Sequence, residues 1–167
     1  VGSEMCIRDR LNNEQRKNGV ATFSGGNHAL AVSWASRQCG VSAKVIMPKT
    51  ADPIRISGCE EMGAEVILTD NIASASEILQ EIAKAESRTI LHPFNDLNMA
   101  YGAASCGAEF IEDMPEANVF IIPVGGGGLI AGMAAAIKHF NPAIKVIGVE
   151  PQGANSLRRS FLSGRPE

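Results

Sequence analysis

Residues Phe120 to Met133 read FIIPVGGGGLIAGM, an apolar run that ends in four consecutive glycines and continues into a helix-like segment. Glycine has no Cβ, so neighbouring backbone N–H groups can converge on one anion, and the N-terminus of the following helix adds partial positive charge. The pattern therefore predicts a strand, a phosphate-binding turn and a helix, with the amides of Gly127, Gly128 and Leu129 facing the anion. The alternative is a flexible turn between a strand and a helix, without a ligand.

Two common nucleotide-binding motifs are absent from this turn. No Lys follows the glycines and no Ser or Thr is placed to bind Mg²⁺, so the nucleoside-triphosphatase pattern GxxxxGK[ST] does not occur. The dinucleotide pattern GxGxxG also fails, because Ile130 stands where the third glycine belongs. The remaining candidates are a small phosphorylated ligand and a phosphorylated cofactor.

Around this turn, short β-branched runs alternate with helical segments. The predicted strands are Val20 to Phe23, Ala43 to Met47, Ala64 to Thr69, Thr89 to Pro93, Val119 to Val124 and Lys145 to Glu150. The predicted helices are Asn27 to Cys39, Pro53 to Met62, Ile72 to Glu86, Asn98 to Asp113, Leu129 to Phe140 and Ala154 to Leu162. Such alternation, with strands as apolar as VFIIPV, is typical of an α/β protein in which helices cover both faces of a parallel sheet. Ligands bind such sheets at the carboxyl ends of the strands.

A second glycine-rich turn, TFSGGNHA (Thr22 to Ala29), follows the first predicted strand. Ser24 and the amides after it can hold a carboxylate at a helix N-terminus, and Asn27 can donate and accept hydrogen bonds beside a polar ring substituent. His28 can serve as an acid or base, although a histidine just inside a helix more often has a structural role. The alternative for the whole stretch is a helix N-cap made by Ser24 or Asn27.

The composition restricts the class of function. The chain has 167 residues, of which 45% are hydrophobic, and a formal net charge of −3, which disfavours nucleic-acid binding. No apolar run approaches the roughly 20 residues of a membrane-spanning helix and no signal peptide leads the chain, so we expect a soluble, cytoplasmic protein without a membrane partner. The four cysteines are scattered without a CxxC pair, which disfavours a zinc site and a disulfide framework.

The first ten residues, VGSEMCIRDR (Val1 to Arg10), fit neither a helical nor a strand period. They resemble a translated sequencing adapter, so we expect residues 1–10 to be non-native and the native chain to continue upstream. Loop-forming residues cluster at PFNDLN (Pro93 to Asn98), midway along the remainder. The sequence thus predicts two α/β lobes with a cleft, a smaller one at residues 11–96 and part of a larger one at residues 97–167.

Several stretches together resemble one family. TFSGGNHALAVSWASRQCGVSAKVIMP, GCEEMGAEVIL, LHPFND and VFIIPVGGGGLIAGMAAAIKHFNPAIKVIGVEP are similar, in this order, to the serine/threonine dehydratases, a family that includes serine racemase, among the fold type II pyridoxal-phosphate enzymes. The resemblance covers the chain from about Leu11 to its end. It implies a tryptophan synthase β-like α/β fold with parallel sheets flanked by helices, and pyridoxal 5'-phosphate as the cofactor.

The resemblance also implies roles for single residues. Asn27 contacts the 3-hydroxyl group of the cofactor ring, and the cofactor phosphate is held by Gly125, Gly126, Gly127, Gly128 and Leu129. The substrate carboxylate is received by the S-x-G-N-H loop, which here consists of Ser24, Gly25, Gly26, Asn27 and His28. Gly25 lies where serine racemase has a second serine that acts as acid/base, so the absence of a side chain there favours elimination over racemisation.

The sequence departs from the family in three places. The lysine that bonds the cofactor belongs to a motif like S-F-K-x-R-G upstream of the S-x-G-N-H loop; that motif does not occur here, so we expect the chain as given to be inactive. Ala103 and Ala104 replace the Gln and Gly of the family's AGQGT stretch, which leaves the choice of substrate open. In the racemase-like branch a divalent-cation site uses a Glu, a backbone carbonyl and an Asp. Glu150 and Ala154 match the first two, but Ser156 replaces the Asp.

The resemblance implies that the parent protein is a lyase, a threonine or serine dehydratase that forms a 2-oxo acid and ammonia by β-elimination. One set of alternatives is a racemase or a hydroxyaspartate-type dehydratase of the same family. Another is a non-catalytic protein whose glycine turns bind a phosphorylated metabolite. The expected partners are a small amino-acid substrate and, in the parent protein, further copies of the same chain in a homo-oligomer.

Overall fold

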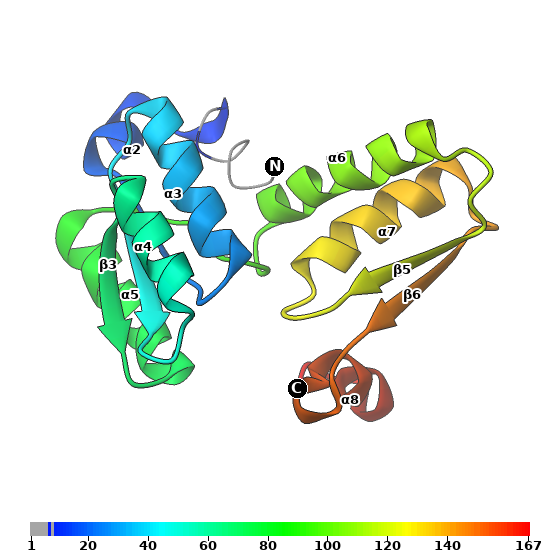
Figure 1. Ribbon diagram of the computed structural model, residues 1–167. Coiled ribbons are helices and arrows are strands. Elements are labelled where there is room, and N and C mark those ends of the chain that lie inside the picture. The colour runs from blue at the N-terminus through cyan, green and yellow to red at the C-terminus, as the bar shows by residue number, and fades with distance from the viewer. Residues whose placement is uncertain (1–6, 8) are drawn as a thin grey trace. The chain divides into compact units, whose positions relative to one another are not determined.

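The computed structural model describes residue 7 and residues 9–167, without the side chains of residues 72 and 73. Most of the segment predicted to be non-native, Val1 to Arg10, lies outside the described residues, as does Cys6. The chain divides between Pro93 and Phe94 into two compact units, whereas the sequence suggested a boundary between residues 96 and 97. We call the described residues 7–93 the first unit and Phe94–Glu167 the second unit, and each is described by itself (Figure 1).

The first unit is a four-stranded parallel sheet with helices between its strands. Its strands are β1 (Val20–Phe23), β2 (Ala43–Pro48), β3 (Glu65–Thr69) and β4 (Thr89–Ile90), and its helices are α2 (Asn13–Asn18), α3 (Asn27–Cys39), α4 (Pro53–Glu61) and α5 (Ile72–Glu86). The strand order is β3-β2-β1-β4, and every neighbouring pair is parallel. The predicted elements of this region are found here, although β4 is shorter than expected. Helix α2 was not predicted; a capping box between Asn12 and Gln15 begins it.

Helices cover both faces of this sheet. All four residues of β1 are buried, and because alternate side chains of a strand point to opposite faces, both faces of β1 are covered. On one face, Phe23 and Ile46 pack against Leu79 of α5. The other face is covered by α3, whose Val32 is fully buried. The predicted arrangement of helices on both sides of a parallel sheet is therefore correct for the first unit.

Local sequence signals explain where these helices begin and end. Asn71 caps α5 by accepting a hydrogen bond from the Ser74 amide at 2.9 Å, a role typical of asparagine. Gly40 ends α3 in the left-handed region, with φ 64°. Asp52 caps α4, and Pro53 follows at its first position.

The second unit contains a two-stranded parallel sheet. Its strands are β5 (Val119–Pro123) and β6 (Lys145–Val149), its helices are α6 (Leu97–Asp113), α7 (Gly128–Phe140) and α8 (Ser156–Ser163), and a 3₁₀ turn, η1 (Gln152–Ala154), precedes α8. Helices α6 and α7 lie side by side (Figure 1). Two glycines show how closely they approach: a Cβ at Gly132 would overlap the Ala100 carbonyl oxygen, and a Cβ at Gly107 would meet the backbone of Met133.

Within the second unit, helices cover only one face of this sheet. Phe120 and Ile122 of β5 pack against Met133 and Ile137 of α7. On the opposite face, four aliphatic side chains remain exposed: Val119 (46%), Ile121 (69%), Ile147 (46%) and Val149 (51%). The prediction that helices cover both faces is therefore wrong for the second unit within Phe94–Glu167. The apolar run VFIIPV resembles a fully buried strand, but helices pack only against its Phe120 and Ile122 side.

Candidate functional site

The first part of the candidate site is the glycine turn between β5 and α7. Strand β5 ends at Pro123 and α7 begins at Gly128, with Gly127 at the N-cap in the left-handed region (φ 90°, ψ −9°). The first amides of an α-helix have no carbonyl partner within the helix, and no side chain caps α7. These amides, which include that of Leu129, are therefore available to an anion.

Two positions of this turn need glycine, for different reasons. At Gly127 the positive φ is one that residues with a Cβ rarely adopt. At Gly126 an added Cβ would overlap the ring of Phe94, which lies against the turn. Gly125 has open space around it. The turn therefore presents backbone rather than side chains, which fits a phosphate group.

The second part of the candidate site is the turn between β1 and α3. Helix α3 begins at Asn27 with Gly26 at the N-cap, and no side chain forms a cap hydrogen bond. The alternative interpretation, in which Ser24 or Asn27 caps the helix, is therefore wrong. The Ser24 hydroxyl oxygen instead accepts a hydrogen bond from the Gly26 amide at 3.1 Å. The amides at the start of α3 remain available to a carboxylate.

Two polar groups of this turn have unused hydrogen-bonding capacity. The Ser24 oxygen accepts from Gly26, but its own hydrogen has no acceptor among the described residues. Asn27 is exposed at the first position of α3, and its side-chain amide has no partner in the described part of the chain. Both side chains can therefore contact a ligand without breaking an existing hydrogen bond.

His28 is part of a half-buried network rather than a free acid or base. The Thr22 hydroxyl donates to the Leu91 carbonyl oxygen at 2.6 Å, and Nε2 of His28 lies 3.0 Å from the Thr22 oxygen and 3.2 Å from the Leu91 carbonyl oxygen. A carbonyl oxygen only accepts, so Nε2 carries the proton. Burial lowers the pKa of His28, the bond to Leu91 opposes that shift, and nearby His92 adds to it. The ring is neutral at pH 7, with its Nε2 hydrogen committed to the protein.

Arg55 of α4 contacts this turn, and the sequence analysis missed it. It is the only basic residue of α4, and its Nη1 donates to the Gly25 carbonyl oxygen at 3.3 Å. A signal was present in the sequence, because a cation in the first turn of a helix faces the positive end of the helix dipole. This unfavourable position suggests that the arginine makes a compensating contact elsewhere, and the hydrogen bond to the Gly25 carbonyl oxygen is such a contact.

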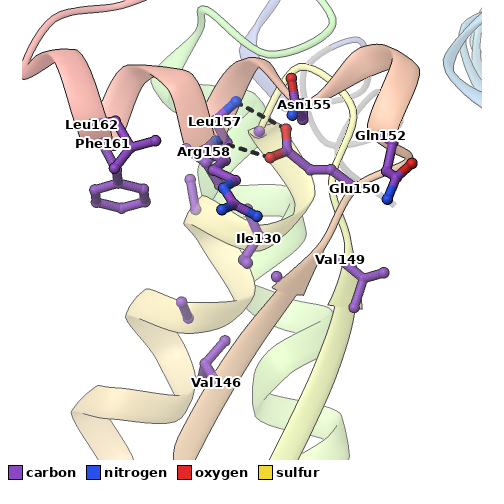
Figure 2. A pocket seen from close by; sticks show the side chains of 14 residues that line it. Ile130, Val146, Val149, Glu150, Gln152, Asn155, Leu157, Arg158, Phe161 and Leu162 are labelled. Atoms are coloured by element: carbon purple, nitrogen blue, oxygen red, sulfur yellow. Dashed lines mark hydrogen bonds between the residues drawn. The ribbon is translucent and has the colours of Figure 1, made fainter.

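Glu150 and Ala154, the candidate cation ligands, lie at the start of α8. The Glu150 carboxylate accepts hydrogen bonds from the amides of Leu157 and Arg158, both at 2.9 Å (Figure 2). Both oxygens therefore stabilise the N-terminus of α8, although Glu150 lies outside that helix. Ala154 is the last residue of η1. No group of three potential metal-ligating side chains occurs among the described residues, so the structure gives the predicted divalent cation no support.

A groove of about 810 Å³ lies between α7, β6 and α8. Figure 2 shows Ile130, Val146 and Phe161 among its apolar lining residues, with the Glu150 carboxylate near one end. Of the residues predicted to bind the cofactor, only Gly127 lines it. The groove is therefore not the predicted cofactor site.

The predicted site residues fall into two groups. Ser24 to His28 lie at the β1–α3 turn and the start of α3 in the first unit, and Gly125 to Leu129 lie at the β5–α7 turn and the start of α7 in the second unit. Each turn follows the carboxyl end of a parallel strand, where ligands of α/β proteins bind. In the described part of the chain, no helix is long and apolar enough to cross a membrane.

Known proteins resemble the chain over nearly its whole length. A family model described as pyridoxal-phosphate dependent enzyme matches residues 2–167, a range that includes most of the predicted adapter segment. The chain is 43% identical over 156 residues to a phenylserine dehydratase of Ralstonia pickettii, covering 93% of this chain and 48% of that protein. It is 41% identical over 158 residues to an L-threonine ammonia-lyase of Thermotoga maritima, covering 94% of this chain and 39% of that protein.

Solved structures give the same result. Maize serine racemase matches with a TM-score of 0.93 and 32% identity, covering 99% of this chain and 50% of that one. Threonine deaminase isoform 2 from Solanum lycopersicum matches with a TM-score of 0.90 and 34% identity, covering 99% of this chain and 48% of that one. The chain thus spans about half the length of the proteins that it matches, or somewhat less.

Proposed function

The chain belongs to the family of pyridoxal-phosphate dependent enzymes, and from this premise we propose that the whole protein is an ammonia-lyase acting on L-threonine, L-serine or a similar β-hydroxy amino acid. Its products are a 2-oxo acid and ammonia. The observation that carries the proposal is the uncapped, glycine-built N-terminus of α7. The relatives named phenylserine dehydratase and L-threonine ammonia-lyase support the type of reaction.

The glycine turn suits the cofactor phosphate. The φ of Gly127 and the ring against Gly126 both exclude a Cβ, so a phosphate group can approach the backbone closely. Gly125 to Gly128 and Leu129 would hold it through their amides. Asn27, with its exposed and unused amide group, would contact the ring hydroxyl.

The cofactor, when bound, supplies an electron sink for the bonds broken at the substrate Cα. The chain itself binds and orients the amino acid. The Ser24 hydroxyl hydrogen and the amides at the start of α3 bind the substrate carboxylate, since none of them has a partner in the described chain that it must give up. His28 holds this turn in place and moves no proton through Nε2, because that hydrogen is already donated to Thr22 and Leu91.

Gly25 favours elimination over racemisation. A glycine offers no side chain that could return a proton to the second face of Cα. A Cβ at this position would lie 3.3 Å from Pro48 and 3.8 Å from Ala51, so the turn could accept a small side chain with only slight movement. The glycine is therefore not imposed by crowding, and its presence bears on the choice of reaction.

The proposal covers the partners as well: a small amino acid as substrate, and a homo-oligomer as the assembled state. It includes the inactivity of residues 1–167 alone, since these residues contain no S-F-K-x-R-G motif. A racemase, a hydroxyaspartate-type dehydratase and a non-catalytic phosphate-ligand binding protein are the competing outcomes. The cation-dependent racemase has less support, because the described residues form no group of three potential metal-ligating side chains.

The test is to recover the full reading frame from its genome, purify the protein and assay it with L-threonine, L-serine and 3-hydroxyaspartate. We expect 2-oxo acid and ammonia in equal amounts, and loss of both when the lysine recovered upstream is replaced by alanine. Light scattering on the same sample tests the oligomer. A D-amino acid as the main product would favour the racemase, and uptake of phosphorylated ligands without turnover would favour the binding protein.

A further inference from the structure

The peptide between Gly25 and Gly26 is held at both ends. Its carbonyl oxygen accepts from Nη1 of Arg55 at 3.3 Å, and its N–H donates to the Ser24 hydroxyl oxygen at 3.1 Å. The guanidinium group lies so close that a Cβ at Gly26 would approach Nη1 within 2.9 Å. Both partners are side chains. Ser24 belongs to the turn itself, whereas Arg55 belongs to α4 and lies outside the S-x-G-N-H motif.

Such a peptide needs to be held. Glycine on both sides removes the steric restriction on the two dihedral angles next to the peptide, so the unit can rotate and exchange its C=O and N–H directions. Rotation would break the bond between Gly26 and Ser24 and so move the hydroxyl group that is expected to contact the substrate carboxylate. A charge-assisted hydrogen bond to the carbonyl oxygen opposes this rotation.

Arg55 is well placed for this role. Asp52 caps α4 by accepting from the Ile54 amide at 2.9 Å, and Pro53 fixes the first helical residue, so the backbone that carries Arg55 is ordered. Arg55 is half-buried and forms no salt bridge among the described residues. Its charge is therefore not neutralised by a neighbouring carboxylate, and it lies against the turn that precedes the uncapped N-terminus of α3.

We propose that Arg55 is a positioning residue for the substrate loop Ser24 to His28: by holding the Gly25 carbonyl oxygen it keeps the Gly25–Gly26 peptide in one orientation, and with it the Ser24 hydroxyl group. The link to the substrate carboxylate rests on the proposed function. The holding of the peptide does not, because it is a property of the chain without any ligand.

The test is amide hydrogen exchange by NMR on the full-length protein without added ligand, comparing R55M and R55K with the original sequence. R55M removes a charged hydrogen bond, so we expect the Gly26 amide to exchange about fivefold faster. The amide signals of residues 25–28 should also shift, while those of β2 stay in place. R55K keeps a charge and a donor, and we expect at least half of the lost protection to return.

A matched control is R37M. Arg37 of α3 also donates to one carbonyl oxygen across to the α4 region, that of Glu61 at 3.2 Å, but it lies at the far end of α3. This variant should leave residues 25–28 unchanged. If R55M changes the turn no more than R37M does, or if R55K exchanges as fast as R55M, the proposal is wrong.

A second variant tests the same contact from the other side. G26A places a methyl group where the guanidinium lies, so we expect it to displace Arg55 and to accelerate exchange at residues 25–28 much as R55M does. The double variant should then differ little from either single variant. Additive effects would overturn the proposal, even if R55M alone proved poorly folded.

The full-length enzyme provides a readout of the consequence for substrate binding. R55M should raise KM for the amino acid about tenfold with little change in kcat, because it disturbs the carboxylate-binding turn rather than the reacting atoms. If the full-length protein produces no 2-oxo acid, the proposed function fails, whereas the exchange measurements still decide whether Arg55 holds the peptide. A change in kcat alone, with KM unaltered, would contradict a positioning role.

Discussion

The two units use the same alternation of strand and helix, but they bury their sheets differently. In the first unit every residue of β1 is buried, with α3 on one face and α5 on the other. In the second unit one face of β5 and β6 packs on α7 and the other exposes Ile121 and Val149. The strand sequences VATF and VFIIP are both largely apolar, so the difference lies in what surrounds the strands.

The exposed apolar side chains follow the same division. In the described part of the first unit, the exposed large apolar residues are Trp34, Ile54 and Leu68. All other exposed large apolar residues of the described chain belong to the second unit. Clustered exposed apolar side chains mark surfaces that bind something. The matched proteins contain about as many residues again as this chain, so they have further segments with which to cover such a face. The comparison shows that an apolar strand sequence predicts burial of the strand but does not identify which element covers it.

The largest expected effect comes from the helix contact that holds the second unit together. Replacing Gly132 by Val forces side-chain atoms against the backbone of Ala100 and Ala104, so we expect a loss of about 3 kcal/mol or more in the free energy of unfolding of that unit. Urea unfolding followed by the emission of Tyr101, the only tyrosine, measures it. G153A is the control, since a Cβ there meets nothing within 4 Å. An unchanged midpoint for G132V would show that α6 and α7 are not in this contact.

A pair of isoleucines tests the difference between the two sheets directly. Ile46 of β2 is fully buried in a cluster with residues of β1 and α5, so I46A should lower the free energy of unfolding of the first unit by about 3 kcal/mol. Ile121 is 69% exposed, so I121A should change that of the second unit by less than about 0.5 kcal/mol. Emission of Trp34, the only tryptophan, reports on the first unit. Equal losses from the two substitutions would mean that the Ile121 face is covered in solution.

The glycine turn of the second unit should respond in graded steps. G126A overlaps the ring of Phe94 and should weaken binding of pyridoxal phosphate about thirtyfold; G127A strains a backbone with φ 90° and should weaken it about fivefold. G125A meets open space and should weaken it least. Fluorescence titration of the full-length protein measures the three affinities. A uniform loss across the three variants would argue against this conformation of the turn.

The smallest expected effect is on the pH dependence of the first unit. Because burial lowers the pKa of His28, the unfolded state binds a proton near pH 6.5 that the folded state does not. Stability is therefore complete above about pH 6.5 and falls as the pH drops below it. Urea midpoints measured from pH 7.5 to 5.5 should fall for the original chain and fall less for H28Q, whose amide can still donate to Leu91. Identical slopes would show that His28 does not cause the dependence.

Local patterns in the sequence determined most of the elements and both glycine turns. The boundaries of β1, α3 and α5 follow from β-branched runs, from Asn71 as a cap and from Gly40 as a stop, all of which act within a few residues. The candidate site residues of the two turns could be proposed for the same reason, since a backbone anion site needs only glycines at the start of a helix. The resemblance to the family was noticed on these same local stretches, whereas family membership rests on matches over nearly the whole chain.

Only the tertiary structure decided which groups meet across the fold. Arg55 reaches Gly25, and His28 reaches Leu91, over separations in sequence at which no short-range pattern operates. At shorter range, the sequence also did not show that the Glu150 carboxylate accepts hydrogen bonds from the first amides of α8. Periodicity showed that VFIIP is apolar, but whether each of its faces is buried depends on helices packed from elsewhere in the chain. Such contacts depend on how helices and strands pack in three dimensions. No short stretch of the sequence specifies that packing.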